Sequence, residues 1–145
     1  MKIILATKQK HFVDAFRIRA RVFVGEQKVQ VDLEIDKFDE NALIFVAYQK
    51  ETAVGTGRII IKDHAAKIGR VAVVKEQRCS GIGSQLILKM MKDLKDHKQV
   101  KEIHIGAQIN TMKFYEKLGY KAYGHSFNEA GIKHIMMKYQ LNTIA

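Results

Sequence analysis

Residues 70–86 of this 145-residue chain read RVAVVKEQRCSGIGSQL: a β-branched run, a short polar turn and the start of an amphipathic helix. Gly81 and Gly83 open that helix, and glycine accepts backbone angles that other residues avoid. The first N–H groups of a helix lack partners within it, and the helix dipole attracts negative charge there. A strand, a glycine turn and a helix in this order predict a binding loop for a diphosphate.

Two familiar phosphate loops do not match these residues. The dinucleotide fingerprint needs a third glycine, but none follows Gly83 before Gly106. The nucleoside-triphosphatase loop needs a lysine between its last glycine and Ser/Thr, and Ser84 follows Gly83 directly. What is left is Arg-x-x-Gly-x-Gly, from Arg78 to Gly83.

That spacing resembles the acetyl-coenzyme A loop of the GNAT superfamily of N-acetyltransferases. A second segment, NTMKFYEKLGY at 110–120, resembles the later cofactor-contacting helix of the same family and follows a short apolar run. RVFVGEQKV at 21–29 and GIKHI at 131–135 are similar to segments of small single-domain bacterial members. The resemblance covers nearly the whole chain and implies one N-acetyltransferase domain over residues 1–145.

The resemblance implies an α/β fold with one mixed, mostly antiparallel sheet of six or seven strands and about four helices. Hydrophobic periodicity predicts N-terminal helices with Phe12, Val13, Phe16, Ala20 and Phe23 on one face. It also predicts a helix from residue 82 and another over 110–118 that Gly119 closes as a C-cap. Strands are expected at 2–6, 43–48, 54–61, 67–74, 102–107, 120–127 and 133–141. The helix after the glycines should bury Ile82, Leu86, Ile87, Met90, Met91 and Leu94.

The composition indicates the cellular compartment and the classes of binding partner. The single cysteine excludes an internal disulfide, and no apolar run is long enough to cross a membrane, so a cytoplasmic protein is expected. The net charge of +10 is spread along the chain without a recognition helix or metal-finger spacing, which disfavours specific nucleic-acid binding. Residues 26–40 are acidic by contrast. This segment is either a solvated loop or a lining that attracts a cationic amine.

The resemblance assigns acetyl-CoA contacts to three places. The strand at 71–73 should offer backbone N–H groups to the oxyanion, the loop amides should surround the diphosphate, and Arg78 should pair with a phosphate oxygen. Cys79 occupies a position open to almost any residue and is expected to contribute its amide, not a nucleophile. Ser80 and Ser84 are either hydroxyl contacts or helix caps. The expected cofactor-binding residues are Val71, Ala72, Val73, Arg78, Cys79, Ser80, Gly81, Ile82, Gly83, Ser84, Asn110, Phe114 and Tyr115. No metal is expected.

Tyr115 is the favoured general acid, because a phenol near the coenzyme sulfur can protonate the departing thiolate. The alternative is a structural tyrosine packed with Phe114 and Leu118. Asn110 is expected to cap the following helix, to bond the pantetheine arm, or both.

Several residues are candidates for the general base that removes the proton of the amine. By analogy with the small bacterial members, His134 and Glu129 are the chosen candidates beside Glu26, Glu34 and Asp36. A histidine has a suitable intrinsic pKa, although a lone strand histidine is often structural. An amine that arrives neutral would need no dedicated base.

The expected activity is therefore acetyl transfer from acetyl-CoA to a primary amine of a small molecule. A protein lysine or N-terminus is an alternative acceptor. Alternatives from other classes are a non-catalytic acyl-CoA sensor and a basic nucleic-acid-binding domain. A homodimer through the terminal strands is expected by analogy only.

Overall fold

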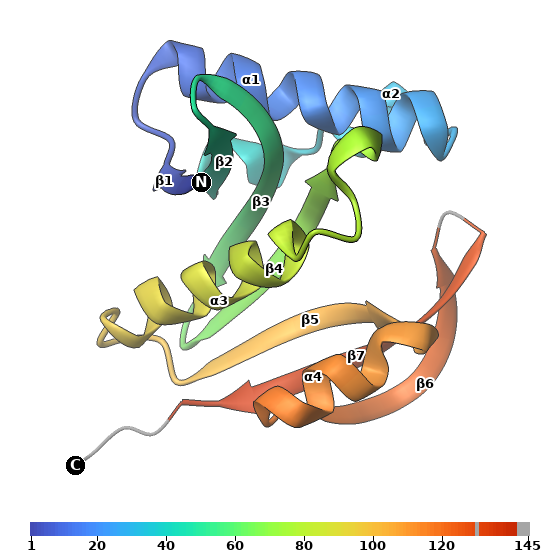
Figure 1. The fold of residues 1–145 in the computed structure, drawn as a ribbon. Coiled ribbons are helices and arrows are strands. Elements are labelled where there is room, and N and C mark those ends of the chain that lie inside the picture. The colour runs from blue at the N-terminus through green and yellow to red at the C-terminus, as the bar shows by residue number, and fades with distance from the viewer. Residues whose placement is uncertain (130, 142–145) are drawn as a thin grey trace.

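The computed structural model describes residues 1–129 and 131–141. One seven-stranded sheet runs through them in the order β1-β2-β3-β4-β5-β7-β6, and β4 and β5 are its parallel pair (Figure 1). The expected mixed, mostly antiparallel sheet is confirmed. The strands are β1 (Lys2–Leu5), β2 (Leu43–Gln49), β3 (Thr52–Lys62), β4 (Ala65–Val73), β5 (Glu102–Gln108), β6 (Lys121–Glu129) and β7 (Ile132–Gln140).

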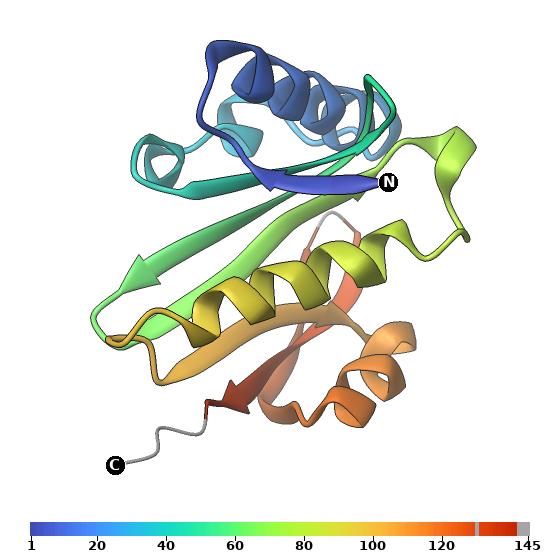
Figure 2. The ribbon, with the colours of Figure 1, turned by 60° about the vertical axis from the view of Figure 1, so that its left-hand side comes forward.

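Helices cover both faces of this sheet. In Figure 2 the N-terminal helices lie on one side of β1–β4, and the longest helix lies on the other side. The four α-helices are α1 (Gln9–Arg19), α2 (Val31–Glu34), α3 (Ile82–Lys95) and α4 (Met112–Leu118). Shorter turns are the π-helix η1 (Ala20–Glu26), which continues α1, and the 3-10 helices η2 (Lys37–Glu40), η3 (Lys75–Gln77) and η4 (Ile109–Thr111). No helix among the described residues has the length and apolarity that a membrane crossing requires.

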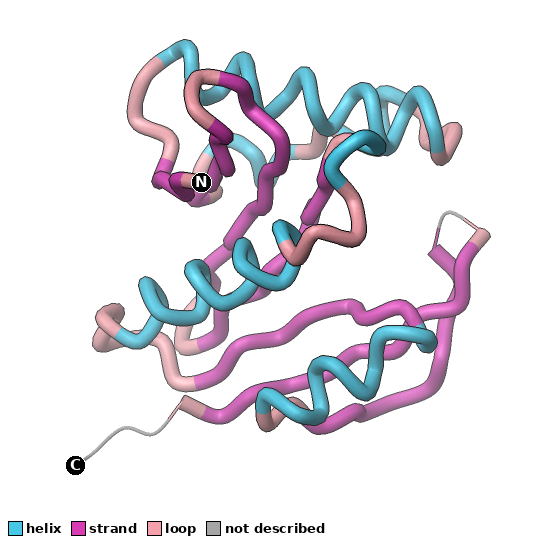
Figure 3. Tube along the Cα trace, viewed as in Figure 1, coloured by secondary structure: helices cyan, strands magenta, loops and turns pink. Residues whose placement is uncertain are grey.

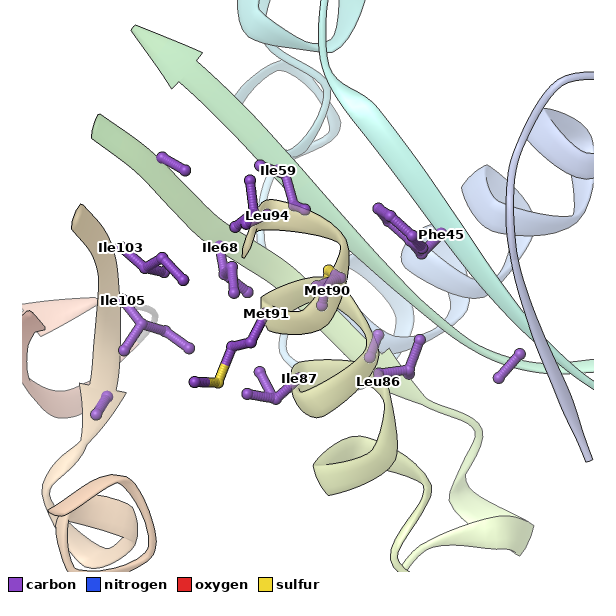
Figure 4. Packing of buried hydrophobic residues seen from close by; sticks show 14 of the residues in the cluster. Phe45, Ile59, Ile68, Leu86, Ile87, Met90, Met91, Leu94, Ile103 and Ile105 are labelled. Carbon is purple, nitrogen blue, oxygen red and sulfur yellow. The ribbon is translucent and has the colours of Figure 1, made fainter. Parts of the chain in front are cut away.

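The main core lies between α3 and the sheet (Figure 4). All six apolar side chains expected to face the sheet from α3 are buried, as predicted. They pack against strand residues such as Phe45, Ile68 and Ile103. A Cβ on Gly57 of β3 would lie 2.6 Å from the Met90 Cε, so the end of the Met90 side chain fills the space above this glycine.

The expected face of α1 is wrong in part. Phe12 and Val13 are 36% and 44% exposed, whereas the buried residues of the helix are Ala15, Ile18 and Arg19. Apolar periodicity missed this face because one of its three buried residues is charged. Arg19 is 1% exposed and is held by ion pairs, which offset part of the cost of burying a guanidinium.

The C-terminal third follows the sequence expectation closely. Gly119 has φ +106° and ends α4 in the left-handed conformation that favours glycine. Helix α4 packs on the same face as α3, against β5 and β7, and leaves the opposite face of these strands without a helix (Figure 1). The edge strand β6 is exposed along its length. That helix-free face and the space between β4 and β5 form the region described next.

Candidate active site

The two parallel strands separate halfway along their length. Pairing of β4 with β5 runs from Ala65 opposite Glu102 to Ile68 opposite Ile105, and no later β4–β5 pair occurs within the described residues. Figure 3 shows the two strands together at their starts and apart at their ends. The ends of both strands therefore keep backbone groups that a neighbouring strand would otherwise bond. An opening lies between the segments 70–74 and 103–107 at which the sequence places the cofactor.

A β-bulge at Arg70 accompanies the separation. The register of β3 against β4 shifts between Thr56 and Arg58, opposite this bulge. Arg70 has φ +49°, a conformation that residues other than glycine rarely adopt. Its guanidinium donates to the carbonyl oxygens of Glu34 and Leu33 at 3.1 Å each, which holds the strained position. Bulges redirect a strand and are frequent beside active sites.

Beyond the bulge, β4 offers free backbone N–H groups toward the opening. The Val74 N–H donates to Val54 O of β3 at 2.9 Å, so the groups of Val73 point the other way. The Val73 carbonyl does face the opening, because Arg78 Nε donates to it at 3.0 Å. The two-residue period of a strand places the Val71 N–H on the same edge.

The loop between β4 and α3 forms a concave set of amides. Cys79 and Gly81 both have positive φ, +64° and +85°, and alternation of left-handed with other conformations turns successive N–H groups inward. Gln85 N–H bonds Gly81 O at 3.0 Å and begins the helical ladder. The N–H groups before it, at Ile82, Gly83 and Ser84, have no acceptor within the helix.

The expected cofactor residues differ in whether their side chains are exposed and able to contact a ligand. Ala72 and Ile82 are 3% and 2% exposed, so their side chains belong to the core. Ser80 is exposed and its hydroxyl donates to the Gln77 carbonyl, which closes the turn before the helix. Cys79 is an exposed free cysteine.

Arg78 is already bonded within the protein. Besides the Val73 carbonyl, its guanidinium bonds the Glu26 carboxylate at the end of η1. A second ion pair, Arg21 with Glu76, joins the same two parts of the chain with the charges reversed. Glu26, one of the candidate bases, is therefore engaged by the loop between β4 and α3.

A groove of about 390 Å³ runs between α3 and α4. Its lining brings together six of the expected cofactor residues from three separate segments: Val71, Gly83, Ser84, Asn110, Phe114 and Tyr115. Ile87 and Thr111 complete the lining and were not predicted. Ile87 was expected only as a core residue, and its helical spacing of four from Gly83 places it on the same side of α3.

Asn110 is not the helix cap that the sequence suggested. It lies within η4, and Thr111 occupies the cap position of α4 without a capping bond from its side chain. The Thr111 hydroxyl instead donates to Gln108 O at 2.8 Å. The intervening 3-10 turn delays the helix by two residues, an offset that periodicity does not resolve.

Tyr115 lies where the groove meets a second, larger cavity, since it lines both. Its ring packs edge-to-face against Phe114 and Tyr120, with centroids 5.1 and 5.6 Å away. Burial raises the pKa of Tyr115 to about 12, so the phenol keeps its proton at neutral pH. Tyr115 therefore brings a protonated phenol to the lining of both cavities.

The larger cavity has a volume of about 870 Å³ and opens on the helix-free face of the sheet. Its floor comes from β3, β4, β5 and β7, and the segment that follows η1 covers it from above. His134 and Glu129 both line it, together with Phe127 and Met136. The favoured acid and both chosen base candidates thus share one cavity.

His134 has a fixed orientation in this cavity. Its Nδ1 lies 2.7 Å from the Ile132 carbonyl, which can only accept, so this nitrogen carries a proton. Its Nε2 lies 3.9 Å from Glu129 Oε2 and its ring stacks on Phe127 at 5.8 Å. The carboxylate is mostly exposed. A neutral ring in this arrangement presents a basic Nε2 to the cavity.

The acidic segment is neither a solvated loop nor a bare anionic lining. Three of its carboxylates are paired with arginines of α1, β3 and β4 in one charge network. Its ion pairs are Arg19–Glu34 (2.6 Å), Arg19–Asp39 (2.6 Å), Arg58–Asp36 (2.9 Å), Arg58–Asp39 (3.0 Å), Arg70–Asp36 (3.3 Å) and Arg70–Glu34 (3.5 Å).

This network changes the list of candidate bases. Glu34 is 2% exposed and bonded to two arginines, so it is a structural anion and not a free base. Asp36 is engaged by Arg58 and Arg70 in the same way. The sequence showed the acidic residues but not that separate strands would neutralise them. Among the described residues, no cluster of three or more His, Cys, Asp or Glu side chains has the arrangement of a metal site.

Comparisons with known proteins agree with this architecture. The family model described as acetyltransferase (GNAT) domain matches residues 7–141. The uncharacterized N-acetyltransferase YjcF of Bacillus subtilis is 34% identical over 138 residues, which are 94% of this chain and 98% of that protein.

Two solved structures share the fold. Escherichia coli ElaA superposes with a TM-score of 0.86 at 24% identity, over 97% of this chain and all of that one. A GNAT family acetyltransferase from Elizabethkingia anophelis with acetyl-CoA bound gives a TM-score of 0.72 at 17% identity, over 97% of each chain. With a family match across nearly the whole sequence, this chain belongs to the GNAT family and is an N-acetyltransferase.

Proposed function

We propose that the protein transfers the acetyl group of acetyl-CoA to a primary amine of a small molecule by direct attack. The observation that carries this proposal is the meeting of two cavities at Tyr115, beside the unpaired edge of β4. The smaller groove suits the pantetheine arm, and the larger cavity suits the acceptor. Solved GNAT structures with bound acetyl-CoA support this choice of acyl donor.

The β4–α3 loop fits the diphosphate of the cofactor. Gly81 takes a left-handed conformation with no heavy atom within 4 Å of the position of a Cβ, which leaves room above the loop. Loop amides from Cys79 to Ser84 and the N-terminus of α3 would face the phosphates, and Arg78 would pair with one of their oxygens. Asn110 and Phe114 would flank the arm along α4.

The backbone N–H groups of Val71 and Val73 would stabilise the oxyanion. When bound, acetyl-CoA supplies a thioester carbonyl and a thiolate leaving group. Negative charge develops on the carbonyl oxygen during attack, and each aligned donor contributes about 3–4 kcal/mol at that stage. The donors are main-chain groups, so the valine side chains are free to pack.

Tyr115 would act as the general acid. Its phenol is neutral at working pH because its pKa is raised to about 12, and it stands at the junction through which the sulfur must leave. A proton delivered to the thiolate prevents return of the acetyl group.

His134 would act as the general base, with Glu129 beside it. The Nδ1 proton is bonded to the Ile132 carbonyl, so Nε2 is the nitrogen that can accept a proton from the amine. Glu129 Oε2, at 3.9 Å, would stabilise the resulting imidazolium.

The proposal places residues 1–145 in one acetyltransferase domain that works in the cytoplasm. An exposed, unpaired Cys79 suits a reducing compartment. A homodimer through the terminal strands is also part of the proposal, and the exposed edge strand β6 supports it.

Two measurements test this function. Calorimetric titration of acetyl-CoA should give a Kd in the micromolar range, and a panel of primary amines should release free thiol in its presence. A sensor would bind acetyl-CoA but release no thiol with any amine, whereas a protein acetyltransferase would label peptides and not small amines. Absence of acetyl-CoA binding would refute the proposal.

A further inference from the structure

The wall of the larger cavity is basic. Four cationic side chains line it, namely Lys28, Arg58, Lys67 and Arg70, against two carboxylates, Glu34 and Glu129. We propose that the acceptor carries an oxyanion group, carboxylate or phosphate, in addition to its amine, and that the Lys67–Arg70 side of the cavity holds that group. This inference rests on the proposed function, because it concerns the acceptor of the same reaction.

Strand register places the basic groups and His134 on one face of the sheet. Lys67 lies opposite Ile60, which is two residues from Arg58, so Lys67 and Arg58 project to the same side. Lys67 is also opposite His104 of β5, and His104 shares its face with Gln108, four residues further along.

Gln108 in turn lies opposite His134 of β7. The cavity floor therefore has a basic end on β3 and β4 and a His134 end on β7. An amine placed at the His134 end leaves the other end of a small acceptor beside Lys67 and Arg70.

The three arginines of the network are matched in charge by the carboxylates of Glu34, Asp36 and Asp39. The positive charge that a ligand can use therefore comes from cationic groups outside these ion pairs. Lys28 and Lys67 are both exposed, and neither takes part in the ion pairs found among the described residues. The Arg58 Nε, although buried, has no hydrogen-bond partner there.

Arg70 is the network member that a ligand can reach. Its side chain is 22% exposed, compared with 1% for Arg19 and 6% for Arg58. Burial, followed by the neighbouring charges of Arg58 and Arg19, lowers the pKa of Arg70. An anion could bond the exposed part of this guanidinium, and guanidinium–oxyanion bonds are among the stronger hydrogen bonds in proteins.

The same charges oppose a polycationic acceptor. A substrate with several ammonium groups would bring them against the unpaired Lys28 and Lys67, where like charges repel in a partly desolvated site. An amine that also bears an oxyanion is instead oriented by the cavity, with its two ends toward opposite walls. The lining thus selects a zwitterionic or amino-phosphate acceptor over a polyamine.

The test compares matched ligand pairs that differ only in the oxyanion. One pair is 4-aminobutanamide and 4-aminobutanoic acid, and the other is glucosamine and glucosamine 6-phosphate. Their Kd values are measured by calorimetry on protein saturated with CoA, so that the diphosphate loop is filled and phosphate probes report on the cavity. Thiol release with acetyl-CoA is measured in parallel.

In at least one pair, the member with the added oxyanion should bind about tenfold tighter or more, and the pair that responds distinguishes carboxylate from phosphate. Lys67→Glu should reduce that ratio to about twofold or less, because it reverses a charge on the cavity wall. Lys62→Glu is the matched control, since Lys62 is an exposed lysine outside the cavity lining, and it should keep the wild-type ratio.

Equal binding within both pairs, or an unchanged ratio in Lys67→Glu, would overturn the oxyanion site. Thiol release with amines that carry no oxyanion would in that case still support the proposed function. Loss of acetyl-CoA binding would instead refute the function, and the ligand pairs titrated without CoA would still decide whether the basic wall selects oxyanions.

Discussion

The Arg78 guanidinium bonds the Glu26 carboxylate, so a residue of the proposed phosphate loop is tied to the end of η1. The Glu26 carboxylate accepts the hydrogen bond from Arg78 that a phosphate oxygen of the cofactor would otherwise accept. The residues that follow Glu26 cover the larger cavity. If the loop binds phosphate as proposed, its filling and the position of this cover are linked through the Arg78–Glu26 pair.

The first prediction concerns this ion pair. Glu26→Gln should strengthen CoA binding by up to about fivefold, because an exposed pair of this kind is worth about 0–1 kcal/mol and the competing anion is gone. Arg78→Ala should weaken CoA binding by about tenfold. Calorimetry measures both, with Glu40→Gln as an exposed control that should not change the Kd. Weaker binding in Glu26→Gln would contradict competition.

Tyr115→Phe should lower kcat by about 100-fold or more while the Kd for CoA changes less than twofold, because the ring is kept and only the proton donor is lost. The pKa of Tyr115 is about 12, so the wild-type rate should show no loss from phenol ionisation up to pH 10. Tyr123→Phe removes a hydroxyl that bonds His104 and belongs to a residue outside the lining of both cavities, so it serves as control. An unchanged kcat in Tyr115→Phe would exclude it as the acid.

Gly81→Ala should weaken CoA binding by about tenfold without a large loss of fold. The left-handed conformation costs a non-glycine residue about 1–2 kcal/mol, although no atom would clash with the new methyl group. Gly124→Ala is matched, since Gly124 also has positive φ and open space but lies in β6. Both variants should lose similar stability in urea, and only Gly81→Ala should lose CoA affinity. Equal CoA binding in the two would show that loop conformation is not required.

The charge network should govern acid stability. Burial alone would raise the pKa of Asp39, but hydrogen bonds from Arg19, the Asp36 backbone and Arg58 lower it to about 2. A carboxyl with a lowered folded-state pKa stabilises the fold above its unfolded pKa, near 4, and this contribution is lost as the pH falls through 2.

Asp39→Asn should accordingly cost about 3 kcal/mol of unfolding free energy at pH 7, because it leaves buried arginines short of a partner. It should also flatten the decline of stability between pH 4 and pH 2. Urea unfolding across this range measures both effects, and Asp32→Asn, at an exposed carboxylate, is the control. A wild-type-like acid slope in Asp39→Asn would contradict the assigned role.

The order of elements and the core of α3 could be predicted because they depend on local patterns. Alternation marks the strands, a 3.6-residue period marks α3, and Gly81 and Gly119 mark helix ends. That six of the expected cofactor residues come together in one groove could be predicted for a different reason. Its residues fall in two short segments whose spacing resembles a known family, and the fold brings those segments together.

The network and the basic cavity wall could not be predicted in this way. Arg19 and Glu34 are 15 residues apart and Arg58 and Asp36 are 22 apart, so their pairing depends on how η1 and α2 fold back over the sheet. Arg58 within an apolar strand was the available signal, because a charge in such a run needs a buried partner. The bulge at Arg70 has no local signature, since its left-handed residue is not glycine.

The most direct test of the account is calorimetric titration of acetyl-CoA into the wild-type protein and into Gly81→Glu. A carboxylate at position 81 would stand in the concave set of amides and repel the diphosphate. The account predicts saturable one-site binding to the wild type and at least 100-fold weaker binding to a folded Gly81→Glu variant, which is a loss of about 2.7 kcal/mol or more. Equal affinity for both proteins, or no binding to the wild type, would contradict it.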